Sequence, residues 1–443
     1  MGEAEDLKKT FSNTVDKLIK DIKRQEKIMI RSDKRQRQEY DELQHRLEEV
    51  QKLQLAQKEL MDSFIKLMAG AIDAKSKYTG NHCSRVPEIT MMIAQKASEY
   101  DVGIFKEFKI KSDEEYRELE IASWLHDCGK VITPEYVVDK ATKLETIYNR
   151  IHEIRTRFEV IHRDLTIEAL NKKLAGSDAK EVDSWLEKEH NKLLEEFEFV
   201  AKSNVGSEFM SDDDQDRISI IAKKTWTRNF DDTLGLAHEE KKRVLKEQSV
   251  TPSIETLLSD KARHIIPREH RDLEEYKEKG FKTPIPDDLY NLGEIYNLNI
   301  TRGTLTQEER FKIMEHAMMT IKMLETLPFT DTLKNVPLYA GAHHETLIGT
   351  GYPRKLTIDD MPIPARIMAL ADVFEALTAH DRPYKEPKTL SESIKILSFM
   401  VKDQHLDKDI FELFLKTGIY KEYAANYLQE DQLDEVDINK FLS

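Results

Sequence analysis

The chain has 443 residues and a formal net charge of −15, with 34% charged residues and few glycines (15) or prolines (13). This length is sufficient for two or three domains with a buried core. The scarcity of glycine and proline, with long stretches of Glu, Lys, Leu, Gln and Ala, favours a mostly helical protein. The negative charge excludes a general attraction to nucleic acid polymers or to an anionic membrane surface, so an anionic ligand must be bound by local positive charge.

The cysteines and the apolar pattern bear on the compartment. Cys83 and Cys128 are the only cysteines and lie in polar helical sequence, so we interpret both as free thiols in a reducing cytosol. The chain has no apolar run long enough to span a membrane, and it starts with a charged helix rather than a signal peptide. We therefore expect a cytoplasmic protein, or the cytoplasmic part of a membrane-anchored sensor.

Residues 1–62 are rich in Lys, Glu and Gln, with apolar positions spaced mostly three and four apart. The apolar positions include Leu43, Leu47, Val50, Leu53, Leu60 and Phe64. Gln54 and Gln57 interrupt the seam, so the heptad pattern is imperfect. The pattern predicts a coiled-coil helix that forms a homodimer. The alternative is a single solvated helix.

The next segment, 63–140, contains the first candidate ligands. A Thr-Gly-Asn turn ends one helix and places His82 in the first turn of the next. A helix over about 114–127 delivers His126 and Asp127 at its C-terminal end, where Gly129 breaks it.

Residues 141–302 have the composition of an inserted helical subdomain. We predict helices over about 143–173 and 178–203, a loop at 211–214, and no chemistry specific to this insertion.

The last segment, 303–443, has the clearest helix signals. Thr306 is a good N-cap and Glu309 completes a capping box, so a helix should run through His316 to Leu324. A second helix is expected over 364–377, and amphipathic helices follow from 389.

Seven side chains with metal-ligand chemistry lie on predicted helices or helix ends: His82, His126, Asp127, His316, His343, His344 and Asp372. Mixed nitrogen and oxygen ligands suit iron, manganese, nickel or zinc better than magnesium or calcium. Seven ligands are too many for one tetrahedral ion. Two ions bridged by Asp127 would use them all, and two-metal sites are common in phosphate ester hydrolysis.

Several motifs together resemble the HD-GYP family, a branch of the HD phosphohydrolases that degrades the bacterial second messenger cyclic di-GMP. They are His126-Asp127-Cys128-Gly129-Lys130, His343-His344-Glu345 with Gly351-Tyr352-Pro353, and the run 371–378 followed by Asp381-Arg382-Pro383-Tyr384. The resemblance covers roughly 61–140 and 303–420. It implies an all-α fold, an HD-type helical bundle that here carries an N-terminal coiled-coil helix and an inserted helical subdomain.

The resemblance also implies roles for individual residues. The seven side chains become ligands of two divalent ions, most often iron or manganese, with Asp127 and Lys130 as catalytic residues. Lys130, Arg382 and Lys385 become the phosphate contacts. The implied reaction is attack of a metal-bridging hydroxide on phosphorus, which opens cyclic di-GMP to pGpG, with GMP as a further product. An upstream sensor or a diguanylate cyclase is the implied partner.

The chain departs from the family pattern in three places. The insertion separates Lys130 from His316, so His152 is a rival ligand, although the helix through His316 looks more like the family's. Ile348 replaces the aspartate expected before Gly349, which affects anchoring of the Gly-Tyr-Pro loop. Tyr78 replaces a glutamate that binds an additional metal in some members, which favours two ions.

Two alternative functions remain open from the sequence. A phosphodiesterase for another cyclic dinucleotide, such as cyclic GMP-AMP, would have the same motifs. A module that binds metal or nucleotide without turnover, and signals through the coiled coil, is the alternative from a different class.

Overall fold

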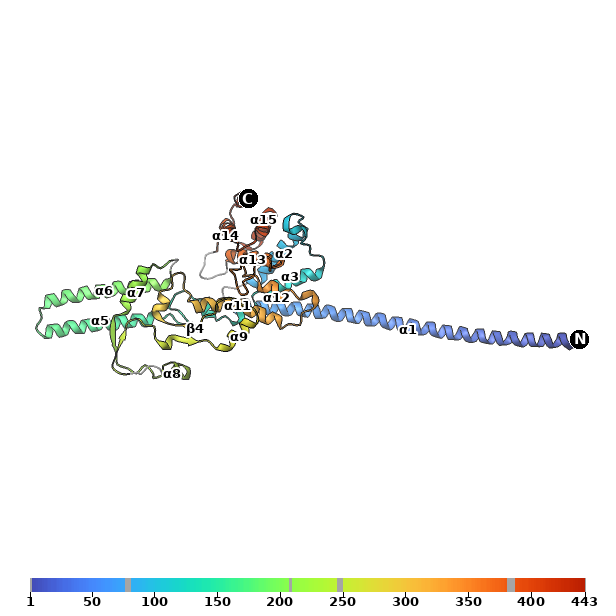
Figure 1. The fold of residues 1–443 in the computed structure, drawn as a ribbon, viewed down its shortest axis with the longest axis horizontal. Coiled ribbons are helices and arrows are strands. Elements are labelled where there is room, and N and C mark those ends of the chain that lie inside the picture. Colours follow the sequence, from blue (N-terminus) through green and yellow to red (C-terminus); the bar gives the residue numbers. More distant parts are fainter. Residues whose placement is uncertain (1, 76–80, 207–208, 245–249, 381–386, 443) are drawn as a thin grey trace. The chain divides into compact units, whose positions relative to one another are not determined.

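The computed structural model describes residues 2–75, 81–206, 209–244, 250–380 and 387–442, and within these ranges the side chains of 270–273 are not considered. The chain divides into two units, residues 1–65 and 66–443 (Figure 1). No helix in the described ranges is long and apolar enough to cross a membrane. Cys83 and Cys128 are free thiols, as predicted, and both are buried.

The first unit lies within helix α1 (Gly2–Lys75). Every side chain from 2 to 60 is exposed, including the apolar Leu43, Leu47 and Val50. Ion pairs four residues apart support the section of the helix from Asp33 to Arg46, for example Arg46 with Glu42 at 2.6 Å. The apolar side chains of such a helix remain in contact with water unless a partner covers them.

The all-α prediction for the remainder is confirmed, because helices form its main body. Before the insertion these are α2 (His82–Glu99), η1 (Gly103–Lys106), α3 (Asp113–Leu125), η2 (Cys128–Ile132) and α4 (Glu135–Val138). After it come α11 (Gln307–Glu325), η4 (Asp331–Leu333), α12 (Val336–Gly341), α13 (Ile363–Thr378), α14 (Leu390–Lys402), α15 (Lys408–Lys416), α16 (Ile419–Tyr427), η5 (Glu430–Gln432) and η6 (Ile438–Lys440).

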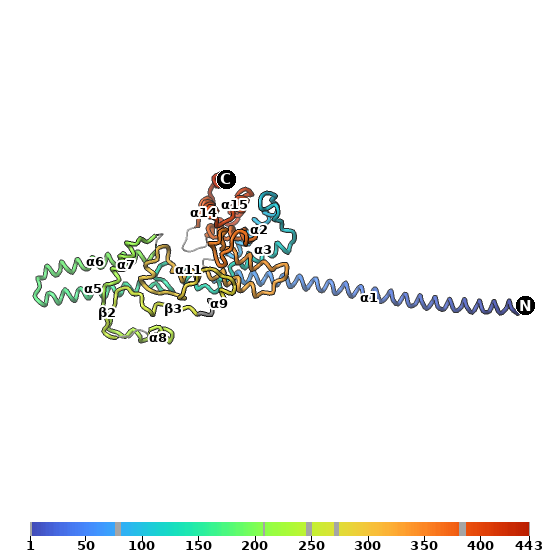
Figure 2. Tube along the Cα trace, in the orientation of Figure 1, coloured from blue at the N-terminus to red at the C-terminus, as the bar shows by residue number. Residues whose placement is uncertain are grey.

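Helix α13 is at the centre of this helical body. It is apolar on several faces, and Ile367, Leu370 and Phe374 are fully buried. The Phe374 ring packs edge-on against Phe414 of α15 and Tyr423 of α16, with centroids 5.0 and 5.6 Å apart. Helix α2 contacts both α13 and α15, so segments from the two ends of the sequence lie side by side (Figure 2).

The inserted segment is mostly helical, as predicted, and also contains two short antiparallel ribbons. Its elements are α5 (Ile151–Leu174), α6 (Ala179–Val205), α7 (Asp212–Ala222), β1 (Thr225–Arg228), α8 (His238–Val244), β2 (Ser253–Thr256), η3 (Ala262–His264), β3 (Ile265–Pro267), α9 (His270–Glu278), β4 (Asp288–Asn291) and α10 (Glu294–Leu298). Strand β1 pairs with β2 and strand β3 pairs with β4. Helices α5 and α6 form a hairpin (Figure 1).

Two local predictions for this segment were wrong. Helix α5 begins at Ile151 rather than near 143, because the preceding residues make tertiary bonds instead: Lys143 Nζ donates to Leu298 O at 2.8 Å. The loop expected at 211–214 is the start of helix α7. Ser211 caps that helix and forms a capping box with Asp214, so the acidic run lies in the first helical turn.

The insertion has a hydrophobic core of its own, to which both of its ends contribute. This core includes Leu144, Ile154, Phe158, Leu193, Val200, Ile218, Leu257 and Leu298. A second cluster joins the later part of the insertion to α11 and contains Tyr276, Phe281, Phe311, Met318 and Ile321. We call the residues of the first cluster, from Leu144 to Leu258 with Leu298, the distal part of the insertion, which packs on itself. The proximal part contains Tyr276 and Phe281 and packs on α11.

Helix α11 and the short helix η2 cross at very close range. The Thr320 hydroxyl accepts a hydrogen bond from Gly129 N at 2.9 Å and donates one to His126 O at 3.1 Å. A Cβ added at Gly129 would lie 1.9 Å from His316 O and 2.6 Å from Thr320 N. Only glycine allows this approach, which places the end of α3 beside His316.

We therefore predict that Gly129→Ala lowers the free energy of unfolding by roughly 1–3 kcal/mol, because two backbones must separate. Gly70→Ala is the matched control. Gly70 lies inside α1 with open space around its Cβ position, so alanine there should raise helix stability by about 0.5–1 kcal/mol. Urea unfolding followed by circular dichroism measures both. Equal stability of Gly129→Ala and wild type would contradict the argument.

Candidate metal centre

The structure brings the seven predicted ligand side chains together from separate elements. His82 starts α2, His126 ends α3, His316 lies on α11 and Asp372 on α13, with Asp127, His343 and His344 at adjoining helix ends. They form two groups in which the potential ligand atoms lie within 4.8 Å of one another. One group is His82, His126 and Asp372, and the other is Asp127, His316, His343 and His344.

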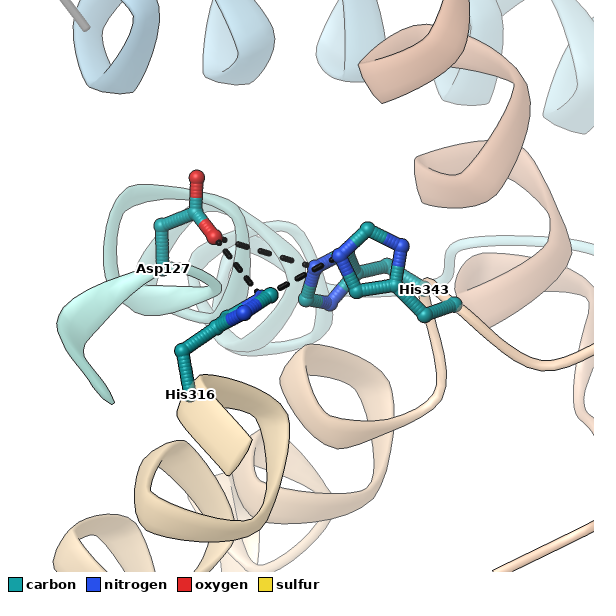
Figure 3. Close-up of side chains that lie close together, drawn as sticks. Asp127, His316 and His343 are labelled. Carbon is teal, nitrogen blue, oxygen red and sulfur yellow. Dashed lines mark hydrogen bonds and ion pairs between the residues drawn. The ribbon is translucent and has the colours of Figure 1, made fainter. Parts of the chain in front are cut away.

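The Asp127 carboxylate lies between the two groups. Its Oδ2 is 3.2 Å from Nε2 of His82 and 3.2 Å from Nε2 of His126. Its Oδ1 is 3.4 Å from Nε2 of His316 and 3.9 Å from Nε2 of His343, as Figure 3 shows. Each oxygen thus faces a different set of imidazoles. This is the geometry that a bridging carboxylate requires.

Backbone hydrogen bonds orient three of the imidazoles in the same way. Nδ1 of His126, His316 and His343 each bonds the carbonyl oxygen three residues earlier, at 2.7, 2.5 and 2.5 Å. A carbonyl only accepts, so Nδ1 must be the protonated nitrogen in each ring. With the proton on Nδ1, the Nε2 atom of each ring faces Asp127, which is the orientation that a metal ligand needs.

His82 is oriented by a carboxylate that we did not predict from the sequence. Glu375 is fully buried, accepts a hydrogen bond from His82 Nδ1, and takes Arg85 Nε on its other oxygen at 2.6 Å. Burial would raise the pKa of Glu375, but His82 and Arg85 lower it to about 2. Glu375 lies one helical turn after Asp372, so its position on the same face of α13 was the available signal.

The charges at the centre are strongly coupled. Burial would raise the pKa of Asp127, but the Lys130 ammonium and the His126 ring hold it well below its usual range. Burial would lower the pKa of Lys130, which Asp127 and Asp372 instead raise. Lys130 Nζ donates to Asp127 Oδ2. Asp127 is therefore a carboxylate and Lys130 an ammonium at neutral pH.

Two buried atoms at the centre have no hydrogen-bond partner among the described residues. They are Oδ1 of Asp127 and Nε2 of His343, which face one another across the second group. Burial lowers the pKa of His343 to about 4, so its ring is neutral and cannot donate from Nε2. Unpaired buried acceptors are costly unless a cation lies between them. The donor set and its orientation thus fit a divalent metal.

The Gly-Tyr-Pro loop packs directly on the second group. The Tyr352 ring stacks on His344 with centroids 4.7 Å apart, and Tyr352 N donates to His344 O at 3.2 Å. Ile348, where the family has aspartate, is exposed. The loop is held instead by Glu345, which is fully buried and accepts from Arg354 N at 2.6 Å, and by the Thr346 hydroxyl.

The remaining predicted residues lie elsewhere. His152, the rival ligand, is exposed on α5, and its Nδ1 bonds Arg155 rather than any member of the two groups. Arg382, Lys385 and Tyr78 fall outside the described residues. The phosphate contacts of Arg382 and Lys385 stay predictions.

Comparison with known proteins is consistent with this geometry. Residues 252–410 match the HD domain family, a range that includes His316, His343, His344 and Asp372 and begins within the insertion. A 3'3'-cGAMP-specific phosphodiesterase of Vibrio cholerae is 32% identical over 151 residues, which is 32% of this chain and 34% of the relative. A cyclic di-GMP phosphodiesterase of Thermotoga maritima is 32% identical over 157 residues, 35% of this chain and 40% of the relative.

A third relative, a cyclic di-GMP phosphodiesterase of Pseudomonas aeruginosa, is 31% identical over 157 residues, 35% of this chain and 34% of the relative. The matches thus span between 34% and 40% of the length of these three relatives. The helical fold, the His and Asp cluster and the family match define an HD domain. The motifs of the chain resemble those of the HD-GYP branch of this family, and the three relatives are named as cyclic dinucleotide phosphodiesterases.

We predict that His316→Ala lowers the bound divalent metal after manganese loading and gel filtration, because it removes a donor from the second group. His152→Ala should retain the wild-type content, because its ring is exposed and outside both groups. Atomic emission spectroscopy measures the metal per chain. A loss with His152→Ala and none with His316→Ala would refute the ligand assignment.

Proposed function

We propose that the protein is a metal-dependent phosphodiesterase that opens cyclic di-GMP to pGpG, with GMP as a further product, at a centre of two divalent ions. The observation that supports this most is the Asp127 carboxylate, whose two oxygens face two separate sets of imidazoles. Iron and manganese suit the mixed nitrogen and oxygen donors. The names of the relatives support a cyclic dinucleotide as substrate.

Each group on the chain has a definite task in this proposal. His82, His126 and Asp372 would hold one ion, His316, His343 and His344 the other, and Asp127 would bind both. Two such ions lower the pKa of bound water and neutralise charge on a phosphodiester. Lys130 keeps its proton, so it can offer a fixed positive charge to a phosphate oxygen as negative charge develops on it. Arg382 and Lys385 are the further proposed phosphate contacts.

We expect Asp127→Ala to lose both metal ions and to reduce hydrolysis of cyclic di-GMP by about 100- to 1000-fold or more, because the shared ligand of the centre is gone. Asp183→Ala is the control, since Asp183 is an exposed carboxylate on α6 that pairs only with Lys173 among the residues described. Chromatography of the nucleotide products and metal analysis measure the two effects. Survival of hydrolysis with unchanged metal content would show that the centre is assigned wrongly.

The choice of cyclic dinucleotide needs a separate measurement. Of the three relatives described above, one is named for 3'3'-cGAMP and two for cyclic di-GMP, so a centre of this kind suits both substrates. Turnover of equal concentrations of the two by the iron- or manganese-loaded protein ranks them. A protein that binds metal but leaves both intact over hours would instead support the signalling module without turnover.

We further propose that α1 forms a parallel homodimer through the seam of Leu43, Leu47 and Val50. These side chains follow the four-three spacing of a heptad and are 52–62% exposed in the single chain. Burying them between two helices would remove apolar surface from water along the seam. The helix is also the proposed route by which an upstream sensor or cyclase partner would act.

Truncation before Met61 should convert a dimer to a monomer, measured by light scattering. Leu47→Asp should have the same effect in the full chain, because it places a charge within the seam. Leu55→Asp is the matched control, since Leu55 is equally exposed but lies outside the heptad seam. A dimer that survives both the truncation and Leu47→Asp would refute association through α1.

A further inference from the structure

The proximal part of the insertion lies against the Gly-Tyr-Pro loop. Lys282 N donates to Pro353 O at 2.8 Å, and the buried Thr283 hydroxyl donates to the same oxygen at 3.3 Å. The carbonyl oxygen of Pro353 is thus bonded to a segment of the insertion that is 70 residues away in the sequence. We refer to residues 276–283 as the clamp segment.

A three-membered ion cluster strengthens this contact. Glu325, at the C-terminal end of α11, accepts a hydrogen bond from Arg354 Nη2 on one oxygen at 2.8 Å and from Lys279 Nζ on the other at 2.7 Å. Arg354 Nε also donates to Lys279 O at 3.4 Å, and its guanidinium lies 5.7 Å from the centre of the Phe281 ring. The cluster therefore ties the clamp segment, α11 and the loop to one another.

Apolar packing fixes the clamp segment on the helix that carries His316. Tyr276 and Phe281 pack on α11 in a cluster with Phe311, Met318 and Ile321. The Tyr276 hydroxyl additionally donates to Glu315, the residue before His316. Movement of the clamp segment would consequently disturb both α11 and the loop.

The loop transmits this constraint to His344. Its Tyr352 ring stacks on the His344 ring, and a Cβ added at Gly351 would lie 2.6 Å from His344 O. Arg354 N bonds the Glu345 carboxylate next to His344. The loop backbone therefore lies in direct contact with the chain from His344 to Thr346, with little space for it to shift.

The side chains of His126 and His82 in the first group are oriented by bonds that lie outside the clamp segment and the Gly-Tyr-Pro loop. His126 bonds its own helix, while His82 bonds Glu375 of α13. Neither bond involves the insertion. A change in the clamp segment should for this reason affect one half of the centre and spare the other.

We propose that the clamp segment is a positioning element, which holds the Gly-Tyr-Pro loop through Pro353 and Arg354 and so sets the affinity of the His316, His343 and His344 group for its ion. The proposal rests on the proposed two-metal centre. Arg354, Lys279 and Thr283 are positioning residues, since none of them contacts the seven ligand side chains in the described contacts.

The test compares the affinities of the two manganese ions in the full chain, by isothermal titration and by the rate of release to a chelator. Arg354→Met keeps the length of the side chain but removes the bonds to Glu325 and Lys279. It should weaken one of the two ions about 10-fold and leave the other unchanged, because residues behind a ligand tune its metal affinity. Arg354→Lys, which keeps the charge next to Glu325, should restore part of the loss.

Arg217→Met is the matched control, because Arg217 also lies over a phenylalanine ring, Phe199 at 4.1 Å, but in the distal part of the insertion. It should leave both affinities unchanged. Thermal unfolding monitored by circular dichroism checks that each variant is folded. If Arg354→Met does not fold, the double variant with Lys279→Met and Thr283→Val is used, which keeps the backbone bond from Lys282.

Three results would overturn the inference. They are unchanged affinity of both ions in the clamp variants, equal weakening of both ions, and an effect of Arg217→Met as large as that of Arg354→Met. These readouts do not depend on turnover. A protein that binds two ions with the expected dependence on Arg354 but hydrolyses no cyclic dinucleotide would refute the proposed activity and leave the clamp intact. Wild-type protein that binds no metal would refute both.

Discussion

The position of one carboxylate, Asp127, determines how the rest of the centre is arranged. Its two oxygens are directed to imidazoles from opposite sides of the insertion, so it must be fixed relative to both α3 and α11. The hydrogen bonds of the Thr320 hydroxyl and the absence of a side chain at Gly129 meet that requirement. Orienting bonds to Nδ1 then align the histidines around it. The arrangement of the ligands and the packing of the backbone therefore both depend on the contact between Gly129 and Thr320.

The sequence was sufficient to predict the parts that depend on residue type and local spacing. The helical class, the N-cap of α11 at Thr306 with its capping box, and the start of α2 at His82 all follow from patterns of a few neighbouring residues. The seven side chains that the structure brings together were likewise selected from the sequence, because their residue types suit a metal and the motifs around them resemble those of the HD-GYP family. Their roles as ligands stay a prediction.

What the sequence could not predict depends on distant contacts. Glu375 bonds His82 only because α13 packs on α2, and Thr320 bonds Gly129 only because α11 crosses η2. The clamp segment was assigned no role, since nothing local indicates that Lys282 and Thr283 reach Pro353. The loop expected at 211–214 failed for a different reason. A serine followed by three aspartates suits both a turn and a helix start, and the bond between Ser211 and Asp214 decides between them.

The core of the insertion has a consequence for how the chain reaches its native state. Gly129 and Thr320 are 191 positions apart, and joining two points so distant in a flexible chain is slow and entropically unfavourable. Leu144 and Leu298, near the two ends of the insertion, belong to one hydrophobic core. Once that core has condensed, the residues on either side of it are already neighbours. Folding of the insertion thus shortens the flexible chain that must close when Asp127 and His316 come together. Substitutions in the core of the insertion should therefore slow formation of the centre, although the substituted residues do not contact it.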